Sequence, residues 1–577
     1  MFKLLKYLKK YKIETILAPL FKLLEALLEL YVPIVIKMMI DNGIKKGDNG
    51  YIIKMSLLLF ALAAVGLAFS ITAQFFAAKA AIGFATDLRH DLFAHILGFS
   101  YKTIDKEGTN TLITRMTSDI NQVQSGVNMT LRLLLRSPFV VLGAMIMAFT
   151  IDVKLALIFA VTIPVLSVVV FAIILASIPL YKKVQGALDK VVVMTRETLT
   201  GARVIRAFRQ EDEEIESFKE KTDNLANLQI FVGHISNLLN PVTLIIINIA
   251  TIILIYNGAF SVKSGVLTQG AIVALYNYMA QILEELVKFA NLIINITKSI
   301  SSGDRIAEVL EIESRNDFDE VAYDKTVDEI EIEFSNVSFA YHKGRANAVE
   351  NVSFKANAGE TIGIIGGTGS GKSTLINLIP KFYKTSEGEI KINGENINDI
   401  NDDELRKLVG IVPQKAVLFK GSIRENLCWR KKDATEEELE DALKLSESFD
   451  FVEEKSGKMD YELVAGGKNL SGGQRQRLSI ARALVGRPKI LILDDSSSAL
   501  DMITDKRVRE GIKSLNYNPV TFIVAQRISA IRDADKIIVL DEGSVVGMGT
   551  HSELMDSNET YKEIYKSQYG SEVDYEY

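Results

Sequence analysis

The sequence has almost no cysteine or tryptophan: Cys428 and Trp429 are single examples of each and stand side by side among 577 residues. One cysteine excludes internal disulfides and thiolate metal cages, and we expect Cys428 to be an inert cytosolic thiol. Basic residues are not in excess either. The net charge of −6 argues against nucleic acid as a partner, because binding a phosphate backbone needs a dense basic face.

Charge is absent from three long stretches, 55–78, 155–180 and 235–262. Each is long enough to cross a hydrocarbon core of ~30 Å. Three further apolar segments contain a few charges, and their length favours membrane helices over buried helices of a soluble core. They contain, among others, Lys22, Glu25, Glu29, Arg132, Arg136, Glu284, Glu285 and Lys288. The predicted spans are 13–40, 52–80, 123–151, 154–180, 235–262 and 264–297.

The distribution of lysine and arginine predicts the orientation. The leader 1–12, MFKLLKYLKKYK, has five lysines and no acid, so we expect an amphipathic helix on the cytosolic membrane surface. The segments 81–122 and 181–234 are long and polar, and we expect them to extend the membrane helices into the cytosol. A transmembrane domain at 13–305 follows, with the N-terminus in the cytoplasm.

Acidic residues dominate 306–328, which is expected to be a solvated linker. Beyond it, short β-branched strands alternate with helices, the pattern of an α/β domain at 329–577. The predicted fold is therefore six transmembrane helices with long cytosolic extensions, fused to an α/β domain.

A glycine-rich motif, TIGIIGGTGSGKST, occupies 361–374 and combines an apolar strand, a loop and a helix start. Its glycines let backbone N–H groups wrap phosphates, Lys372 reaches the β/γ oxygens, and Ser373 ligates Mg²⁺. The strand ending at Asp494 supplies a second Mg²⁺-binding group. The predicted nucleotide-binding residues here are Gly366, Gly367, Thr368, Gly369, Ser370, Gly371, Lys372, Ser373 and Thr374.

A second motif, NLSGGQRQRLSIARAL at 469–484, opens a basic helix with Ser471, Gly472, Gly473 and Gln474. A helix cap explains Ser471. It does not explain two consecutive glycines, which favour close backbone approach to a ligand. The chain thus has two candidate phosphate-binding elements about 100 residues apart.

These motifs, in this order, resemble the ATP-binding cassette (ABC) exporters, specifically half-transporters with six membrane helices and one ATPase domain. The resemblance covers essentially the whole chain. It extends to an adenine-stacking position at Tyr341, to Gln414 in VPQKAVLF, and to Asp501 in the SALD loop. Two cytosolic stretches, TNTLITRMTSDINQVQ and TGARVIRAFRQEDEEIESF, resemble the family's coupling regions.

The resemblance implies ATP and Mg²⁺ as ligands, with Ser373, Gln414 and Asp494 at the metal. It also implies that two ATPase domains pair head to tail. Each ATP then lies between the phosphate loop of one domain and the signature Ser471–Gln474, with Asp501 nearby, of the other. A single chain holds half of each site.

The sequence departs from the family pattern at its catalytic positions. Asp495 stands where the family has Glu, Gln526 where it has a switch histidine, and Ala465 where it often has Glu. We therefore predict a site that binds ATP and hydrolyses it slowly, in a heterodimer with a homologous subunit that has an intact Glu and His. The alternatives are an active homodimeric lipid or drug exporter and an ATP-gated channel or regulatory protein.

The substrate is predicted only by class. Lipophilic cations or drugs come first and lipids second, carried across the plasma membrane of a bacterial cell. Glu284 and Glu285 are candidates for attracting cations, although Glu284 and Lys288 are four residues apart and can simply pair. The same holds for Glu25 and Glu29 with Arg132 and Arg136.

Overall fold

The structure is a computed structural model that describes residues 2–314, 329–342, 344 and 346–570. It divides into two compact units. The first, the helical unit, comprises Met1–Leu97 and Thr109–Glu313. The second, the sheet unit, comprises Gly98–Gly108 and Ser314–Tyr577. The sequence did not predict that Gly98–Gly108 would group with the C-terminal unit.

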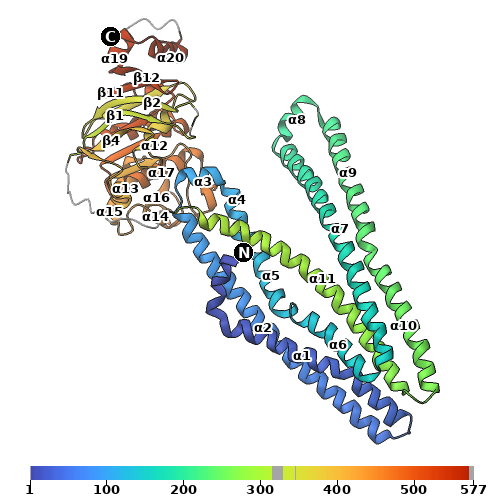
Figure 1. The fold of residues 1–577 in the computed structure, drawn as a ribbon. Coiled ribbons are helices and arrows are strands. Elements are labelled where there is room, and N and C mark those ends of the chain that lie inside the picture. The colour runs from blue at the N-terminus through green and yellow to red at the C-terminus, as the bar shows by residue number, and fades with distance from the viewer. Residues whose placement is uncertain (1, 315–328, 343, 345, 571–577) are drawn as a thin grey trace. The chain divides into compact units, whose positions relative to one another are not determined.

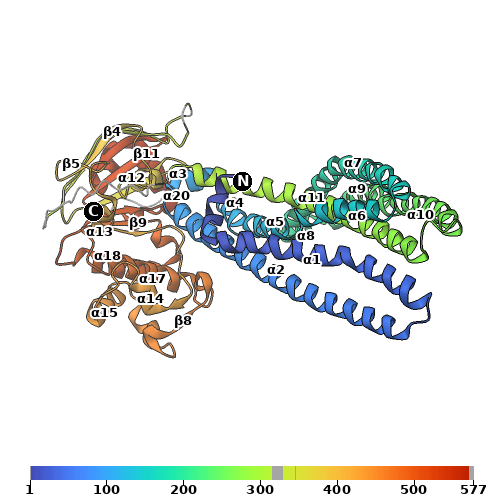
Figure 2. The same cartoon turned by 60° about the horizontal axis from the view of Figure 1, so that its bottom comes forward.

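The helical unit consists of long helices that continue past the predicted spans (Figure 1). Its α-helices are α1 (Lys12–Met38), α2 (Asn49–Leu97), α4 (Thr109–Thr114), α5 (Ile120–Leu133), α6 (Arg136–Ile151), α7 (Val153–Thr200), α8 (Ala202–Phe208), α9 (Glu211–Asn237), α10 (Leu239–Lys263) and α11 (Gln269–Glu311). Shorter π-helical turns occupy Met39–Ile44 and Arg115–Asp119. Helix α1 packs along α2 and α7 packs along α9, as both views show (Figure 2).

The predicted third span, 123–151, is interrupted in the structure. Helix α5 ends at Leu133 and α6 begins at Arg136. Pro138 has no N–H to donate to the carbonyl of Leu134, so the helical hydrogen-bond ladder breaks there. Two shorter helices therefore replace the single helix that the sequence predicts.

By length and composition, four helical stretches of the described residues can cross a membrane: Asn49–Leu97, Thr109–Ile151, Val153–Thr200 and Glu211–Lys263. Helices α1 and α11 are not among them, because charged and polar side chains lower their hydropathy. The predicted count of six spans stays a prediction.

The two ends of the helical unit differ in detail from the segments predicted at 1–12 and 306–328. The leader forms a short 3₁₀ helix, Phe2–Tyr11, with Leu4 buried and its lysines at positions 3, 6, 9 and 10 exposed. The linker predicted at 306–328 begins later than expected, since α11 continues to Glu311. The apolar face of α11 at this end, which includes Ile306 and Val309, is buried and keeps the segment helical. Positions 315–328 lie outside the described residues.

Five charged residues of the interrupted spans form an ion network between α1, α6 and α11, while Glu25 pairs with Lys22 within α1 instead of with an arginine. Arg136 binds Glu29 at 2.6 Å and also pairs with Glu285. Ser137 donates to the other oxygen of Glu285 at 2.9 Å. Lys288 contacts Glu284 at 2.7 Å and Glu285 at 3.1 Å. The predicted Glu284–Lys288 and Glu29–Arg136 pairs are thus present.

The sheet unit is built on two sheets and a two-stranded ribbon within its described residues. The first sheet has the order β2 (Val349–Ala356), β1 (Ile332–Phe339), β4 (Glu387–Ile392), β5 (Glu395–Asn396) and is antiparallel. The second has the order β12 (Ser544–Gly549), β11 (Lys536–Asp541), β3 (Thr361–Gly366), β10 (Val520–Val524), β9 (Ile490–Asp494), β6 (Val409–Val412). It is parallel except at β12. The ribbon pairs β7 (Gly421–Ser422) with β8 (Glu462–Leu463).

The apolar side chains around the parallel sheet form two clusters, one of which includes the strands of the first sheet, and the helices of the unit contribute to both. The helices are α12 (Lys372–Leu378), α13 (Asp402–Leu408), α14 (Ile423–Leu427), α15 (Glu436–Leu445), α16 (Phe449–Glu453), α17 (Gly472–Leu484), α18 (Met502–Lys513), α19 (His551–Ser557) and α20 (Glu559–Tyr569), and α3 (Tyr101–Glu107) belongs to the same unit. In the register of the sheet, Val524 lies beside both Asp494 and Ile364. The loops that follow β3, β9 and β10 therefore open on one sheet edge, where α/β proteins bind ligands.

Candidate nucleotide-binding site

The phosphate loop connects β3 to α12 at that edge. Gly369 and Gly371 have φ angles of +85° and +95°, which side chains rarely adopt. A Cβ atom at Gly371 would also lie 2.3 Å from the carbonyl oxygen of Ala348, while the space around Gly369 is open. The loop geometry thus requires glycine at two of the predicted positions and leaves room for an anion beside the backbone.

Lys372 and Ser373 begin helix α12. The Nζ of Lys372 donates to the carbonyls of Gly366 at 2.9 Å and Gly367 at 2.7 Å, so the ammonium spans the loop. The hydroxyl of Ser373 donates to Oδ1 of Asp494 at 2.9 Å. The structure therefore brings the adjacent lysine and serine together with an acid that lies more than 120 residues later in the sequence.

The electrostatics of this cluster suit Mg²⁺ with phosphate oxygens. Burial raises the pKa of the Asp494 carboxyl, and the charge of Asp495 raises it further. Burial lowers the pKa of the Lys372 ammonium, whereas both acids oppose that shift. The described residues contain no cluster of three or more His, Cys, Asp or Glu side chains that would hold a metal alone. Mg²⁺ is commonly held by one or two carboxylates plus substrate phosphates, and here Asp494 can provide the carboxylate with the Ser373 hydroxyl beside it.

Asp495 follows directly and adopts the left-handed conformation, with φ of +46°. Its carboxylate is buried and accepts two hydrogen bonds on Oδ2, from Nε2 of Gln526 at 2.8 Å and Nε2 of Gln414 at 3.2 Å. Its backbone N–H donates to the carbonyl of Val524. The structure thus joins the three residues that the sequence assigned to catalysis.

Tyr341 reaches the same loop from the first sheet. Its hydroxyl lies 3.0 Å from Oγ1 of Thr374, the residue after Ser373. Its ring packs edge-to-face against Phe339 and Tyr383 and remains 38% exposed. An exposed ring beside the phosphate loop is compatible with stacking on a base, and the adenine role of Tyr341 stays a prediction.

The signature forms the N-terminus of α17. The backbone N–H of Gln474 donates to Ser471 Oγ at 3.2 Å, and the N–H of Ser471 donates to the side chain of Gln474 at 3.0 Å. This is a complete capping box, so local helix chemistry explains Gln474 as well as Ser471. Gly472 faces open space, and a Cβ at Gly473 would lie 3.2 Å from the carbonyl of Ala499.

The structure brings some of the predicted site residues together at the sheet edge and leaves the others outside that cluster. The phosphate loop, Ser373, Asp494, Asp495, Gln414 and Gln526 belong to one cluster on the sheet edge. Asp501 instead caps α18, accepting from the N–H of Thr504 at 3.0 Å. Among the described residues, no hydrogen bond joins Ser471–Gln474 to the phosphate loop. Ala465 lies in a short 3₁₀ turn before the signature.

Sequence analysis missed a contact made by residues 98–108. These residues lie within the cytosolic coupling region predicted at about 81–122, whereas the stretch 109–124 that resembles the family's coupling motif belongs to the helical unit. Within the sheet unit, Tyr101 stacks on Phe382, and Tyr383 donates to Asp105. An aromatic residue on each side was the only signal available, and aromatic residues most often signal core packing.

Comparison with known proteins matches this geometry. A family model of the ABC transporter transmembrane region matches residues 15–286, and a model described as ABC transporter matches residues 349–498. The chain is 36% identical to the uncharacterized ABC transporter ATP-binding protein YfiB of Bacillus subtilis, over 99% of both chains. The chain belongs to the ABC transporter family.

Two other relatives carry more specific names. The putative multidrug export ATP-binding/permease protein YgaD of Bacillus subtilis is 33% identical, with 98% of each chain covered. The ATP-dependent lipid A-core flippase of Desulfotalea psychrophila is 33% identical, with 84% of each chain covered. These names describe those proteins.

A solved bacterial Atm1-family ABC exporter with ATP bound has the same fold, with a TM-score of 0.79, 22% identity, and coverage of 98% and 99%. The predicted fold class is confirmed: a helical transmembrane domain fused to an ABC ATPase domain with a mixed α/β sheet. The family is that of an ATP-driven transporter, and the sheet unit is its ATPase.

Proposed function

We propose that this chain is one subunit of a heterodimeric ATP-driven exporter, and that its own ATP site binds nucleotide but hydrolyses it slowly. One observation carries the proposal. The acid that follows β9 is Asp495, and its carboxylate is tied to the amides of Gln414 and Gln526.

The first reason is reach. Asp is one methylene shorter than Glu, so its carboxylate lies over ~1 Å closer to the backbone, and misplacement of that size costs water positioning dearly. A carboxylate has about four acceptor positions, and two of those of Asp495 are used by the glutamine amides. The acid is therefore held as part of the protein framework.

The second reason is the chemistry of Gln526. An amide carries no charge and does not donate or take up a proton at physiological pH, which a histidine does. The donor nitrogen of Gln526 is directed at Asp495. Its one remaining N–H is uncharged and stabilises charge on a transferring phosphoryl group less than an imidazolium would.

The binding parts of the site are intact by contrast. The hydroxyl of Ser373 donates to Asp494, and the ammonium of Lys372 donates to the carbonyls of the phosphate loop. The glycines of the loop have the positive φ angles that it requires. The signature helix α17 has 13 residues and an exposed, glycine-rich N-terminus. Such a terminus favours an anion, which supports a role in completing a partner's site.

A second candidate is an active homodimer that exports lipids or drugs. The observation in its favour is that an acid remains after β9, in contact with Gln414. We rank it second because the same acid is also bound by Gln526, which replaces the residue able to carry charge.

The ion network supports a substrate class. Arg136 and Glu285 are 7% and 3% exposed, so their charges compensate each other inside the helical unit. The exposed charges are two acids and one base, with the side chains of Glu284, Lys288 and Glu29 68%, 41% and 39% exposed, so carboxylates outnumber the ammonium. Exposed carboxylates favour a lipophilic cation over an anionic lipid. The name of the multidrug relative agrees with this choice, and that of the lipid A-core flippase does not.

The test is ATPase activity in lipid nanodiscs. The chain purified alone should bind MgATP and turn it over slowly, and co-expression with a homologous half-transporter from the same cell should raise turnover at least ~10-fold. The variant Lys372→Ala, which should lose nucleotide binding, assigns the binding signal to this site. Rapid turnover by the lone chain would contradict the heterodimer and favour the homodimer.

A further inference from the structure

The loop that carries Gln526 is clamped by a side chain of helix α20. Gln568 lies in the last turn of α20, and both ends of its side-chain amide bind this loop. Its Nε2 donates to the backbone carbonyl of Gln526 at 2.7 Å, and its Oε1 accepts from the backbone N–H of Ile528 at 2.9 Å. The two bonds use the donor and the acceptor of one planar group, so they fix both the position and the direction of the backbone at 526–528.

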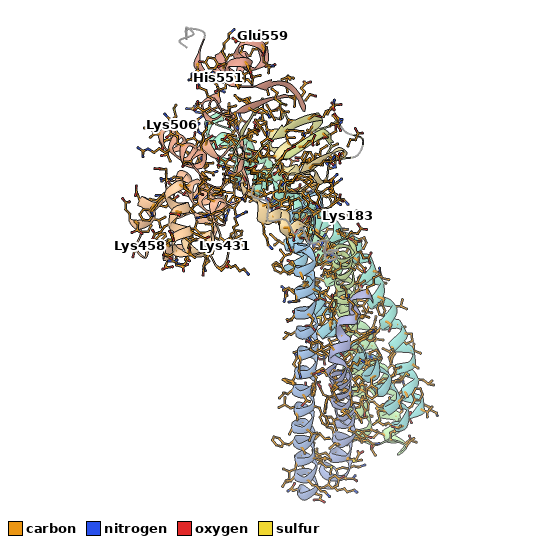
Figure 3. All side chains as sticks on the ribbon, turned by 90° about the vertical axis from the view of Figure 1, so that its left-hand side faces the viewer. Lys183, Lys431, Lys458, Lys506, His551 and Glu559 are labelled. Atoms are coloured by element: carbon orange, nitrogen blue, oxygen red, sulfur yellow. The ribbon has the colours of Figure 1, made fainter. Side chains whose placement is uncertain are left out.

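Helix α20 is itself anchored in the sheet unit. Asn558 caps it, accepting from the N–H of Tyr561 at 2.8 Å, and also donates to the carbonyl of Val546 on β12 at 2.8 Å. Tyr561 is fully buried, and its hydroxyl lies 2.8 Å from Nδ1 of His551, the first residue of α19 (Figure 3). The anchored helix gives the amide of Gln568 a fixed base, although Gln568 is exposed.

The clamp acts on the exposed part of the loop. Strand β10 ends at Val524 inside the sheet, and Ile528 is fully buried where the next short 3₁₀ helix begins. Between these two points, Gln526 and Arg527 are exposed to solvent. Packing against the core therefore does not fix the backbone of these residues, and the two hydrogen bonds of Gln568 do.

The position of Gln526 matters because of Asp495. The Nε2 atom of Gln526 donates to Oδ2 of Asp495 at 2.8 Å, and the same oxygen accepts from Gln414 at 3.2 Å. A hydrogen bond weakens steeply when its donor is displaced or tilted. Gln568 thus holds the backbone that aims the Gln526 amide, and that amide restrains the acid beside the phosphate loop.

We propose that Gln568 is a positioning residue that keeps Gln526 bound to Asp495, so that helix α20 holds this ATP site in its slow state. The inference rests on the proposed function, in which Asp495 is tied into the protein framework. Release of the loop lets the Gln526 amide move away, and the carboxylate of Asp495 regains an acceptor position for water. The acid remains one methylene shorter than a glutamate, so the gain in turnover is small.

The alternative is that the clamp only attaches α20 to the rest of the unit. Gln568→Met separates the two possibilities, because it keeps the length of the side chain and removes both hydrogen bonds. Gln568 is exposed at the end of its helix, so this substitution leaves the core intact. Ser567→Ala is the matched control, because the Ser567 hydroxyl donates to the carbonyl of Ile564 within α20.

The measurement is ATP turnover by the lone chain in lipid nanodiscs, with binding of the fluorescent analogue mant-ATP titrated in parallel. We expect Gln568→Met to raise kcat roughly 3-fold, the size of one net hydrogen bond, and to leave the Kd for mant-ATP unchanged. Ser567→Ala should match the wild type in both. Gln526→Ala should raise kcat by a similar factor to Gln568→Met. Gln568→Met should then add nothing in the Gln526→Ala background, because a residue that acts through Gln526 loses its effect with that side chain.

Hydrogen exchange of the Ile528 amide tests the clamp directly, and it should be faster in Gln568→Met than in Ser567→Ala. Rapid turnover by the unsubstituted chain, or failure to bind mant-ATP, contradicts the proposed function. Slow turnover that Gln568→Met lowers or leaves unchanged overturns the role of Gln568 and leaves the proposed function standing. An undiminished effect of Gln568→Met in the Gln526→Ala background, a weaker Kd for mant-ATP, or unchanged exchange at Ile528 also overturns that role.

Discussion

The side-chain nitrogen of Gln526 lies 2.8 Å from Oδ2 of Asp495, donating a hydrogen bond to the acid that would have to orient the attacking water. The two residues follow the adjacent strands β10 and β9, so their contact is set by the order of the sheet. Each departs from the family pattern, and each is the partner of the other. In the proposed function, Asp495 and Gln526 hold each other in place and do not act on a water molecule or on phosphate.

Replacing Asp495 by Asn should therefore have a small effect on the complex. We expect turnover to fall less than ~3-fold, because in the proposed heterodimer this site would contribute little of it. Removal of the partner's catalytic glutamate should cost at least ~10²-fold. The deciding measurement is single-turnover hydrolysis with the partner's glutamate removed, comparing the wild-type chain with Asp495→Asn. A fast burst that depends on Asp495 would show that this site is catalytic.

Lys372→Ala should weaken nucleotide binding at this chain's own site by at least ~10-fold, since it removes the cation that faces the phosphates. The measurement is mant-ATP titration of the chain alone. Lys506→Ala is the matched control, because Lys506 lies on α18 with its side chain 68% exposed (Figure 3). Equal affinities for the two variants would place nucleotide binding elsewhere.

The sequence predicted those parts of the site that depend on neighbouring residues. The phosphate loop is recognisable because strand, glycines, lysine and helix follow one another, and positive φ at Gly369 and Gly371 explains why glycine is needed. The long membrane helices are recognisable because charge is absent over a bilayer's thickness. The break at Pro138 follows from one missing N–H, although the sequence analysis read through it.

The rest depends on which segments the fold brings together. Asp495 and Gln526 are 31 residues apart, and Tyr383 and Asp105 are 278 apart. No local pattern encodes such contacts, because they follow from strand order and from the grouping of 98–108 with the sheet unit. The role of Gln474 was also missed, since its reciprocal cap on Ser471 requires the actual helix start.

The signature variant Ser471→Ala with Gly473→Glu should lower turnover of the complex at least ~10-fold while leaving mant-ATP binding at this chain's own phosphate loop intact. The reason is that α17 would serve the partner's nucleotide in a head-to-tail dimer. Loss of a cap alone costs ~1 kcal/mol of folding free energy. Thr435→Ala is the control, because Thr435 caps α15 with the same capping box. If both variants lowered turnover alike, the effect would be on stability and the head-to-tail assignment would fail.

Glu284 and Glu285 are neighbours on α11 with opposite expected behaviour. Glu285 is the buried partner of Arg136, so Glu285→Ala leaves that buried guanidinium with only the more exposed Glu29 and should destabilise the helical unit by up to ~3–5 kcal/mol. Glu284 is exposed and contacts only Lys288 among the described residues, so Glu284→Gln should leave the thermal midpoint nearly unchanged. It should instead lower ATP-driven uptake of the cationic dye Hoechst 33342 into inverted vesicles, by several-fold if an exposed carboxylate attracts the cation. Uptake equal to that of the wild type in Glu284→Gln, together with normal stability, would remove the electrostatic argument for a cationic substrate.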